Sequence, residues 1–360
     1  MKDQTLLRHF RGSLIFAAAC LALGAWYGFA QAGTLVGLLR VLWIVVVLSV
    51  LEVSLSFDNA VVNATVLEGM DEVWRKRFLT WGMVFAVYGM YIVFPLAIVA
   101  VAAGIGPVEA VQLSLNDPVR YEQIVSSAHV GIAGFGGAFL SLVGLKFFFD
   151  EDKDIHWIRA VEEFFARFSG LPAIEIGVLL LALWWISAML PDAKGLTFLV
   201  SGILGIVSFI AVDALGKALE QYEERQKLAG AAVRSGLGGF IYLNVLDASF
   251  SFDAVIGAFA LSNNMVIIAL GLSIGAMFVR SMTLMLVRKG TLAEYRYLEH
   301  GAFWAIIALG GIMLISARYE VPEALTGLIG AVLIGASLLW SVRHRRRHPD
   351  EELEAAVRAD

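Results

Sequence analysis

Residues 51–58 read Leu-Glu-Val-Ser-Leu-Ser-Phe-Asp, and residues 246–253 read Leu-Asp-Ala-Ser-Phe-Ser-Phe-Asp. Five of the eight positions are identical at a constant offset of 195, and the Glu52/Asp247 pair keeps its negative charge. Each copy lies inside a long apolar segment, where acidic side chains are rare because a charge is costly to bury there. The chain therefore carries a repeated acidic motif, and the segments around the two copies decide its fold.

The composition around these motifs is that of a polytopic membrane protein. Of the 360 residues, 59% are apolar and 16% charged, and the mean hydropathy is +0.77. A soluble domain is about 45–50% apolar and about 25% charged. The single cysteine, Cys20, excludes a disulfide-stapled secreted scaffold, and the net charge of −5 disfavours nucleic-acid binding. We expect the lipid bilayer to be a partner of this chain and nucleic acid not to be.

Runs of about 20 apolar residues predict ten membrane-spanning helices. Their approximate bounds are 12–31, 37–66, 78–104, 127–149, 172–190, 195–216, 237–262, 265–287, 300–317 and 323–342. Most of the 27 basic residues fall at the chain ends and in every second connecting segment, which is the distribution of cytoplasmic loops. The longest loops, near 105–126, 150–171 and 217–236, are too short for a soluble domain. The sequence thus predicts a multi-pass protein of a bacterial-type inner (plasma) membrane, with both termini cytoplasmic.

The two motif segments are the second and the seventh predicted spans. Because they are five spans apart, they cross the bilayer in opposite directions, which predicts an all-α, 5+5 inverted-topology repeat. Repeat A would cover residues 1–190 and repeat B residues 191–342, each with five helices, and residues 343–360 would form a cytoplasmic tail. Transporters of this build hold their substrate near the midplane, at the interface of the repeats.

Four carboxylates lie near the middles of these two helices: Glu52, Asp58, Asp247 and Asp253. Each costs about 2.5–3.5 kcal/mol or more in the bilayer centre, so a carboxylate there normally faces a partner or a wet cavity. Arg280, in the eighth span, is a possible charge partner for one of them.

Helical spacing adds neutral oxygens to the same faces. Ser56, Asn59 and Asn63 follow Glu52 at intervals that place all four on one face, and Ser251 follows Asp247 by one turn. Two arrangements fit this pattern. Either each motif helix stands centrally in the bundle, with protein on both sides, or it unwinds within the Ser-x-Ser-Phe-Asp stretch and lets the carboxylates converge.

Carboxylate, amide and hydroxyl oxygens are ligands for a hard divalent cation such as Mg²⁺, Ca²⁺ or Mn²⁺. We expect this cation to be cargo rather than a permanent cofactor. Four ionised carboxylates would repel one another, so some should hold protons when no metal is bound, and a metal would then exchange with protons. An enzyme is not expected, because the chain lacks a His-Glu-x-x-His motif and a Gly-x-Gly-Asp context around Asp58 and Asp253.

The stretch Glu52-x-x-Leu55-Ser56-x-Asp58-Asn59 resembles the motif of the TerC family of integral membrane proteins, and Asp247-x-x-x-Ser251-x-Asp253 resembles its second-repeat counterpart. The resemblance covers roughly residues 40 to 320 and fits a branch with extra flanking helices. It implies Mn²⁺ efflux and tellurium-compound resistance. It also nominates an ion site made of Glu52, Asp58, Asn59, Asp247 and Asp253. Ala254 stands where the first copy has Asn59, so the halves would not donate equivalent ligands.

The leading prediction is therefore a Mn²⁺ exporter. Two alternatives stay open: a membrane scaffold for stress-response partners that transports nothing, and a Ca²⁺ or Mg²⁺ carrier with the same mechanism. The sequence leaves the oligomeric state open.

The predicted topology can be tested by cysteine accessibility. Cysteines placed at Glu72 and Gln226 should react with a membrane-impermeant reagent from the cytoplasmic side, and cysteines at Asn116 and Asn264 from the opposite side. Labelling of positions 72 and 226 from opposite sides would contradict the inverted repeat.

Overall fold

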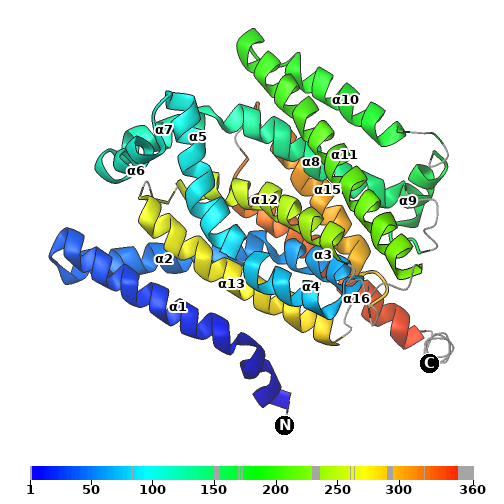
Figure 1. Cartoon of the computed structure of the whole chain (residues 1–360), viewed down its shortest axis with the longest axis horizontal. Helices are drawn as coiled ribbons and strands as arrows, with labels where there is room; N and C mark the ends of the chain where they lie inside the picture. The colour runs from blue at the N-terminus through cyan, green and yellow to red at the C-terminus, as the bar shows by residue number, and fades with distance from the viewer. Residues whose placement is uncertain are drawn as a thin grey trace.

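In the computed structural model of this chain, the regular secondary structure of the described residues is entirely helical (Figure 1). The structure describes residues 2–82, 84–149, 155–168, 173–228, 236–259, 264–289, 295–319 and 321–347, together with positions 171, 261 and 262. The elements in chain order, with η marking π-helices, are α1 (Lys2–Ala32), α2 (Leu35–Leu55), α3 (Phe57–Glu68), α4 (Glu72–Arg77), η1 (Phe78–Gly82), η2 (Phe85–Val93), α5 (Phe94–Ala103), α6 (Pro107–Asn116), α7 (Pro118–Ser127), α8 (His129–Phe148), α9 (Arg159–Ala166), α10 (Ile174–Ser187), α11 (Asp192–Leu228), α12 (Leu237–Phe259), α13 (Met265–Lys289), α15 (Leu298–Ser316) and α16 (Glu323–Arg347). The predicted tail is described only as far as Arg347.

Six helices among the described residues are long and apolar enough to cross a bilayer. They are Phe10–Ala32, Leu35–Leu55, His129–Phe148, Asp192–Leu219, Met265–Val287 and Leu298–Ser316. The remaining predicted spans also coincide with helices, namely 78–104 with η1, η2 and α5, 172–190 with α10, 237–262 with α12, and 323–342 with α16. The chain is therefore an all-helical membrane protein, and the count of ten spans stays a prediction.

Apolar side chains cover the outside of the bundle. Trp26 of α1, Trp43 of α2 and Trp184 of α10 are each more than 60% exposed. Figure 1 shows α1 and α10 at opposite edges of the molecule. In contrast, 61% of the most apolar part of α8 and of α13 is buried inside the bundle, whereas the corresponding share in α2 is 22%. An apolar exterior of this extent is stable only against lipid, so the peripheral helices face the bilayer.

Two short helices, α6 and α7, occupy the segment near 105–126 that the sequence places between spans. Pro107 and Pro118 start α6 and α7, since proline suits the first turn of a helix, where its missing N–H costs nothing. The Asp117 carboxylate also caps α7 by accepting a hydrogen bond from the Arg120 backbone N–H at 3.1 Å. Figure 1 shows α6 and α7 at the upper left, at the other end of the bundle from α4.

The two motif segments differ in their local structure. α2 ends at Leu55 and α3 begins at Phe57, with Ser56 between them at φ −101° and ψ 16°. The Ser56 backbone N–H still donates to the Glu52 carbonyl at 2.9 Å, so this is a local break rather than an unwound stretch. α12, with the second copy, runs from Leu237 to Phe259 as one helix. The first motif segment is thus interrupted only at Ser56, and α12 is not unwound.

Glycine on α13 lets α2 approach closely. Gly271 and Gly275 are one turn apart, and a Cβ atom added to either would meet Leu48 or Glu52 of α2. The Ser49 hydroxyl of α2 also donates to the Gly271 carbonyl oxygen at 3.0 Å. Two glycines four residues apart are a common means of packing membrane helices backbone to backbone. The contact fixes the position of the Glu52 side chain.

Replacement of Gly275 by alanine should therefore destabilise the fold and displace Glu52. The added Cβ would overlap the Cβ and Cγ of Glu52 and lie 2.9 Å from the Ser49 carbonyl oxygen. The Glu52 Cβ and the Ser49 carbonyl oxygen cannot move unless the backbone of α2 moves. Overpacking of this kind costs about 1–3 kcal/mol. Thermal unfolding in detergent should show a lower midpoint for Gly275→Ala, whereas Gly311→Ala, with no atom near its added Cβ, should match the parent. Equal midpoints for the two variants would contradict the close contact.

Candidate functional site

A small polar cavity of about 30 Å³ lies between α2, α3, η1, η2, α12 and α13. Its lining includes seven of the side chains singled out from the sequence: Glu52, Ser56, Asn59, Asn63, Asp247, Ser251 and Arg280. Both copies of the acidic motif thus contribute to one buried site. The face predicted by helical spacing, with Glu52, Ser56, Asn59 and Asn63, lines the cavity as a unit.

Two predicted site residues cannot be placed in this way. Asp58 lies in α3 and Asp253 in α12 by their backbones, but their side chains lie outside the described part of the structure. Their role in the site stays a prediction.

The Glu52 carboxyl group is held at one of its two oxygens. The side chain is only 2% exposed. Its Oε1 accepts hydrogen bonds from the Ser56 hydroxyl at 2.7 Å and the Tyr91 hydroxyl at 2.8 Å. Its Oε2 is also buried, and among the described residues it has no hydrogen-bond partner. A buried oxygen in this state calls for a proton or a ligand.

Asp247 and Asn63 link the two motif segments across the cavity. The Asn63 Nδ2 amide donates to Asp247 Oδ1 at 2.8 Å, joining α3 to α12. Asn63 is buried, and its Oδ1 has no hydrogen-bond partner within the described part of the chain. Ser251 donates to the Asp247 backbone carbonyl at 2.7 Å, which is the usual back-bond of a helical serine. Because the Ser251 hydroxyl donates its hydrogen to the backbone, only its oxygen lone pairs remain to interact with a ligand in the cavity.

Tyr91 is the main site residue that sequence reasoning missed. It belongs to η2, and only 1% of its surface is exposed. A π-helix turns by a smaller angle per residue than an α-helix, so an α-helical wheel of this segment assigns its faces wrongly. The only usable signal was the presence of a tyrosine in an apolar span.

The other π-helix, η1, contributes a backbone acceptor. The Arg280 Nε of α13 donates to the carbonyl oxygen of Leu79 at 2.5 Å. Arg280 thus lines the cavity while anchoring α13 to η1. π-helical turns occur frequently at functional sites, because they expose backbone groups that an α-helix would pair internally.

The chemistry of the cavity is that of hard oxygen ligands. Its described lining offers carboxylates from Glu52 and Asp247, amide oxygens, and hydroxyls. Such donors suit Mg²⁺, Ca²⁺ or Mn²⁺. No group of three or more His, Cys, Asp or Glu side chains with metal-binding geometry occurs within the described residues. The carboxylates placed so far are therefore two of the predicted four.

A larger cavity of about 360 Å³ lies further along α3 and α12, with α8, α11 and α15 completing its wall. It is lined by Val66 of α3 and Tyr242 of α12, about one turn from Asn63 and Asp247 respectively. Asp213 of α11 lies in its wall, paired with Lys146 of α8, and with Lys217 at 3.2 Å. The sequence predicts the cytoplasmic side for this end of α8, α11 and α12.

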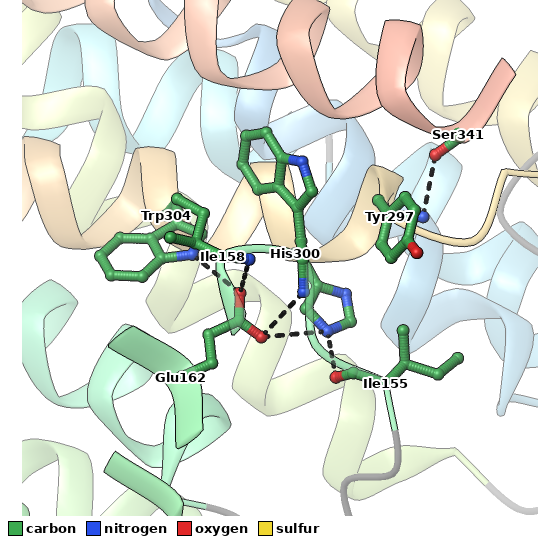
Figure 2. Close-up of polar contacts among 8 residues, drawn as sticks. Ile155, Ile158, Glu162, Tyr297, His300, Trp304 and Ser341 are labelled. Atoms are coloured by element: carbon green, nitrogen blue, oxygen red, sulfur yellow. Dashed lines mark hydrogen bonds and ion pairs between the residues drawn. The ribbon is translucent and has the colours of Figure 1, made fainter. Parts of the chain in front are cut away.

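A separate polar cluster attaches α9 to α15 (Figure 2). The Glu162 carboxylate is 1% exposed and accepts the indole N–H of Trp304 at 3.1 Å and the Ile158 backbone N–H at 3.0 Å. The His300 Nε2 lies 2.7 Å from the Ile155 carbonyl oxygen and 3.6 Å from Glu162 Oε2. His300 is therefore a structural histidine that fixes the segment before α9.

Comparison with known proteins identifies one family. Residues 57–348 match a family model described as "Protein of unknown function (DUF475)". No curated protein and no solved structure matches the chain.

The role of Glu162 can be tested by limited proteolysis. In Glu162→Ala, the Trp304 indole and the backbone N–H groups of Trp157 and Ile158 lose their acceptor, at about 1–3 kcal/mol for each buried donor left unpaired. Trypsin should then cleave faster at Arg159 and Arg167. Glu163→Ala is the matched control, because Glu163 pairs with Arg159 at the exposed surface. Equal cleavage of both variants would show that Glu162 does not anchor α9.

Proposed function

The chain belongs to the family of unknown function DUF475, and we propose from its site that it is a divalent metal cation transporter that exports Mn²⁺ in exchange for protons. One observation carries the proposal: a buried Glu52 carboxyl oxygen with no hydrogen-bond partner among the described residues, in a cavity that Asp247 also lines. Ionisable groups inside a membrane bundle are expensive and normally mark an ion pathway.

The size and the donors of the cavity favour Mn²⁺ as cargo. About 30 Å³ holds only about one or two water-sized bodies, so an entering cation must shed most of its water. Mg²⁺ dehydrates reluctantly and usually keeps several waters. Zn²⁺ and copper prefer nitrogen or sulfur ligands, which the described lining lacks.

Three pairs of helix contacts agree with the proposed 5+5 inverted repeat, whereas the packing of α8 on α11 and of α1 on α13 has no counterpart of comparable extent among the described helices. Exchange of the first five predicted spans for the last five relates α1 to α11, α2 with α3 to α12, η2 to α13, and α8 to α15. Under this exchange the contact between α1 and α2 corresponds to the contact between α11 and α12, and both contacts are present. The contact between α3 and α15 corresponds to the contact between α12 and α8, and these two are also present. The contacts of α13 with α2 and of η2 with α12 form a third such pair.

The larger cavity offers a route between the site and one membrane face. It lies about one turn from the polar cavity along α3 and α12, on the side predicted to be cytoplasmic. In the proposed cycle a cation enters here from the cytoplasm and reaches Glu52 and Asp247 when the intervening turn opens.

The resemblance to TerC proteins supports the same proposal, since that family is associated with Mn²⁺ efflux. We accordingly place the protein in a bacterial-type inner membrane with both termini cytoplasmic, and assign it no resident cofactor and no catalytic activity. Asp58, Asn59 and Asp253 complete the proposed ion site with Glu52 and Asp247, and Ser56 and Ser251 are its supporting hydroxyls.

Proton exchange follows from the charge of the empty site. Two or more ionised carboxylates in a buried cavity repel one another, so protons should occupy the site when the metal leaves. A metal ion that binds there must displace those protons, which makes the two cargoes mutually exclusive. Protons that enter from outside would then release Mn²⁺ on that side.

The proposal predicts that Mn²⁺ flux in reconstituted vesicles follows an imposed pH gradient. Glu52→Gln and Asp247→Asn should each reduce the flux by about tenfold or more, since each removes a charged ligand. Both variants should fold, because the new amide oxygen can still accept the bonds from Ser56, Tyr91 or Asn63. A metal-sensitive dye inside the vesicles measures the flux.

Asp192→Asn is the control, since Asp192 is exposed in the first turn of α11 and should not affect the flux. The proposal fails if Mn²⁺ flux ignores the gradient and survives both cavity substitutions. Flux that depends on Glu52 but not on pH would retain the cation site and contradict the exchange.

A further inference from the structure

We propose that Tyr91 sets the cation selectivity of this site by restricting Glu52 to one free oxygen, which discriminates against Ca²⁺. The inference rests on the proposed cation transport and adds to it the residue that decides which ions are accepted. No element of the repeated motif contains this tyrosine.

The hydrogen bonds at Glu52 are the starting point. A carboxylate oxygen has two lone-pair directions, and those of Oε1 receive the hydroxyls of Ser56 at 2.7 Å and Tyr91 at 2.8 Å. Glu52 Oε2 receives no hydrogen bond from any described residue. Glu52 can therefore give a cation Oε2 alone and acts as a monodentate ligand.

The placement of Tyr91 makes this restriction a fixed feature. Its side chain is 1% exposed and lies in the cavity wall, in the π-helix η2. Tyr88 lies in the same π-helix and is 57% exposed on the outside of the bundle. Ser56, in contrast, follows Glu52 by four residues in the same motif segment, so the local structure at the break between α2 and α3 already brings its hydroxyl to the carboxylate. The hydroxyl that depends on the tertiary fold is that of Tyr91.

Divalent cations differ in how many oxygens of one carboxylate they bind. Ca²⁺ takes six to eight oxygens and often binds carboxylates through both oxygens, whereas smaller octahedral ions accept one oxygen from each. A cavity of about 30 Å³ leaves little room for waters that could replace the missing oxygen. The site as built therefore satisfies six-coordinate Mn²⁺ better than Ca²⁺.

The test compares Mn²⁺ and Ca²⁺ binding to the purified full-length protein and its Tyr91→Phe variant, by equilibrium dialysis. Loss of the hydroxyl frees one lone pair of Oε1 and should raise Ca²⁺ affinity relative to Mn²⁺ by about tenfold. Tyr88→Phe makes the same chemical change outside the cavity and should leave the ratio unchanged. Ser56→Ala combined with Tyr91→Phe should shift it further.

An infrared difference spectrum of the parent protein tests the same point without a change at Tyr91. Mn²⁺ binding should produce the wide carboxylate band splitting of a monodentate ligand, and this signal should be absent from Glu52→Gln. A bidentate splitting in the parent, or an unchanged ratio in Tyr91→Phe while Mn²⁺ still binds, would overturn the role of Tyr91 and leave the cation site intact. Absence of any Mn²⁺ or Ca²⁺ binding by the parent would overturn the proposed function itself.

Discussion

The burial of one carboxyl group, that of Glu52, constrains the helices around it. A carboxyl group in the middle of a membrane bundle is tolerated only where neighbouring groups satisfy it. Here the helix break at Ser56, the inward tyrosine of η2 and the glycine face of α13 all meet at this side chain. A bulkier residue at Gly275 would move Glu52, and a regular α-helix in place of η2 would turn Tyr91 away. The helix break at Ser56 and the π-helix η2 therefore both place hydrogen-bond donors on the same buried carboxyl group.

The second motif contributes through a different contact. Asp247 lies on an unbroken helix and accepts a hydrogen bond from the Asn63 amide of the first motif segment. A direct hydrogen bond therefore joins the two motif segments. The copies are therefore unequal: one supplies the broken helix and the partly satisfied carboxyl group, the other a continuous helix. This inequality agrees with the Asn59/Ala254 difference in the sequence. A site built from unlike halves can present a different ligand set to each side of the membrane.

Much of this site could be predicted from spacing alone. Glu52, Ser56, Asn59 and Asn63 line one cavity because α3 continues the helical path of α2 past Ser56, so an ordinary helical wheel holds across the break. Arg280 was identified because a cation is conspicuous in an apolar span, and it does line the cavity. An α-helical wheel does not apply to the third span, where π-helical turns shift the register and bring Tyr91 inward. No pattern in a single sequence predicts a π-helix, so the contact between Tyr91 and Glu52 could not be predicted.

The sequence predicts an all-helical membrane protein with a repeated acidic motif, because a charge is costly to bury in lipid and the few acidic residues inside apolar runs therefore stand out. It also determined which side chains share a face within one helix. Which helix faces meet is seen only in the folded chain: α13 packs against α2 through Gly271 and Gly275, Asn63 contacts Asp247, and Tyr91 contacts Glu52. These contacts join residues up to 226 positions apart, as between Ser49 and Gly275. They depend on close packing, which is specified by the fit of whole surfaces rather than by any local pattern.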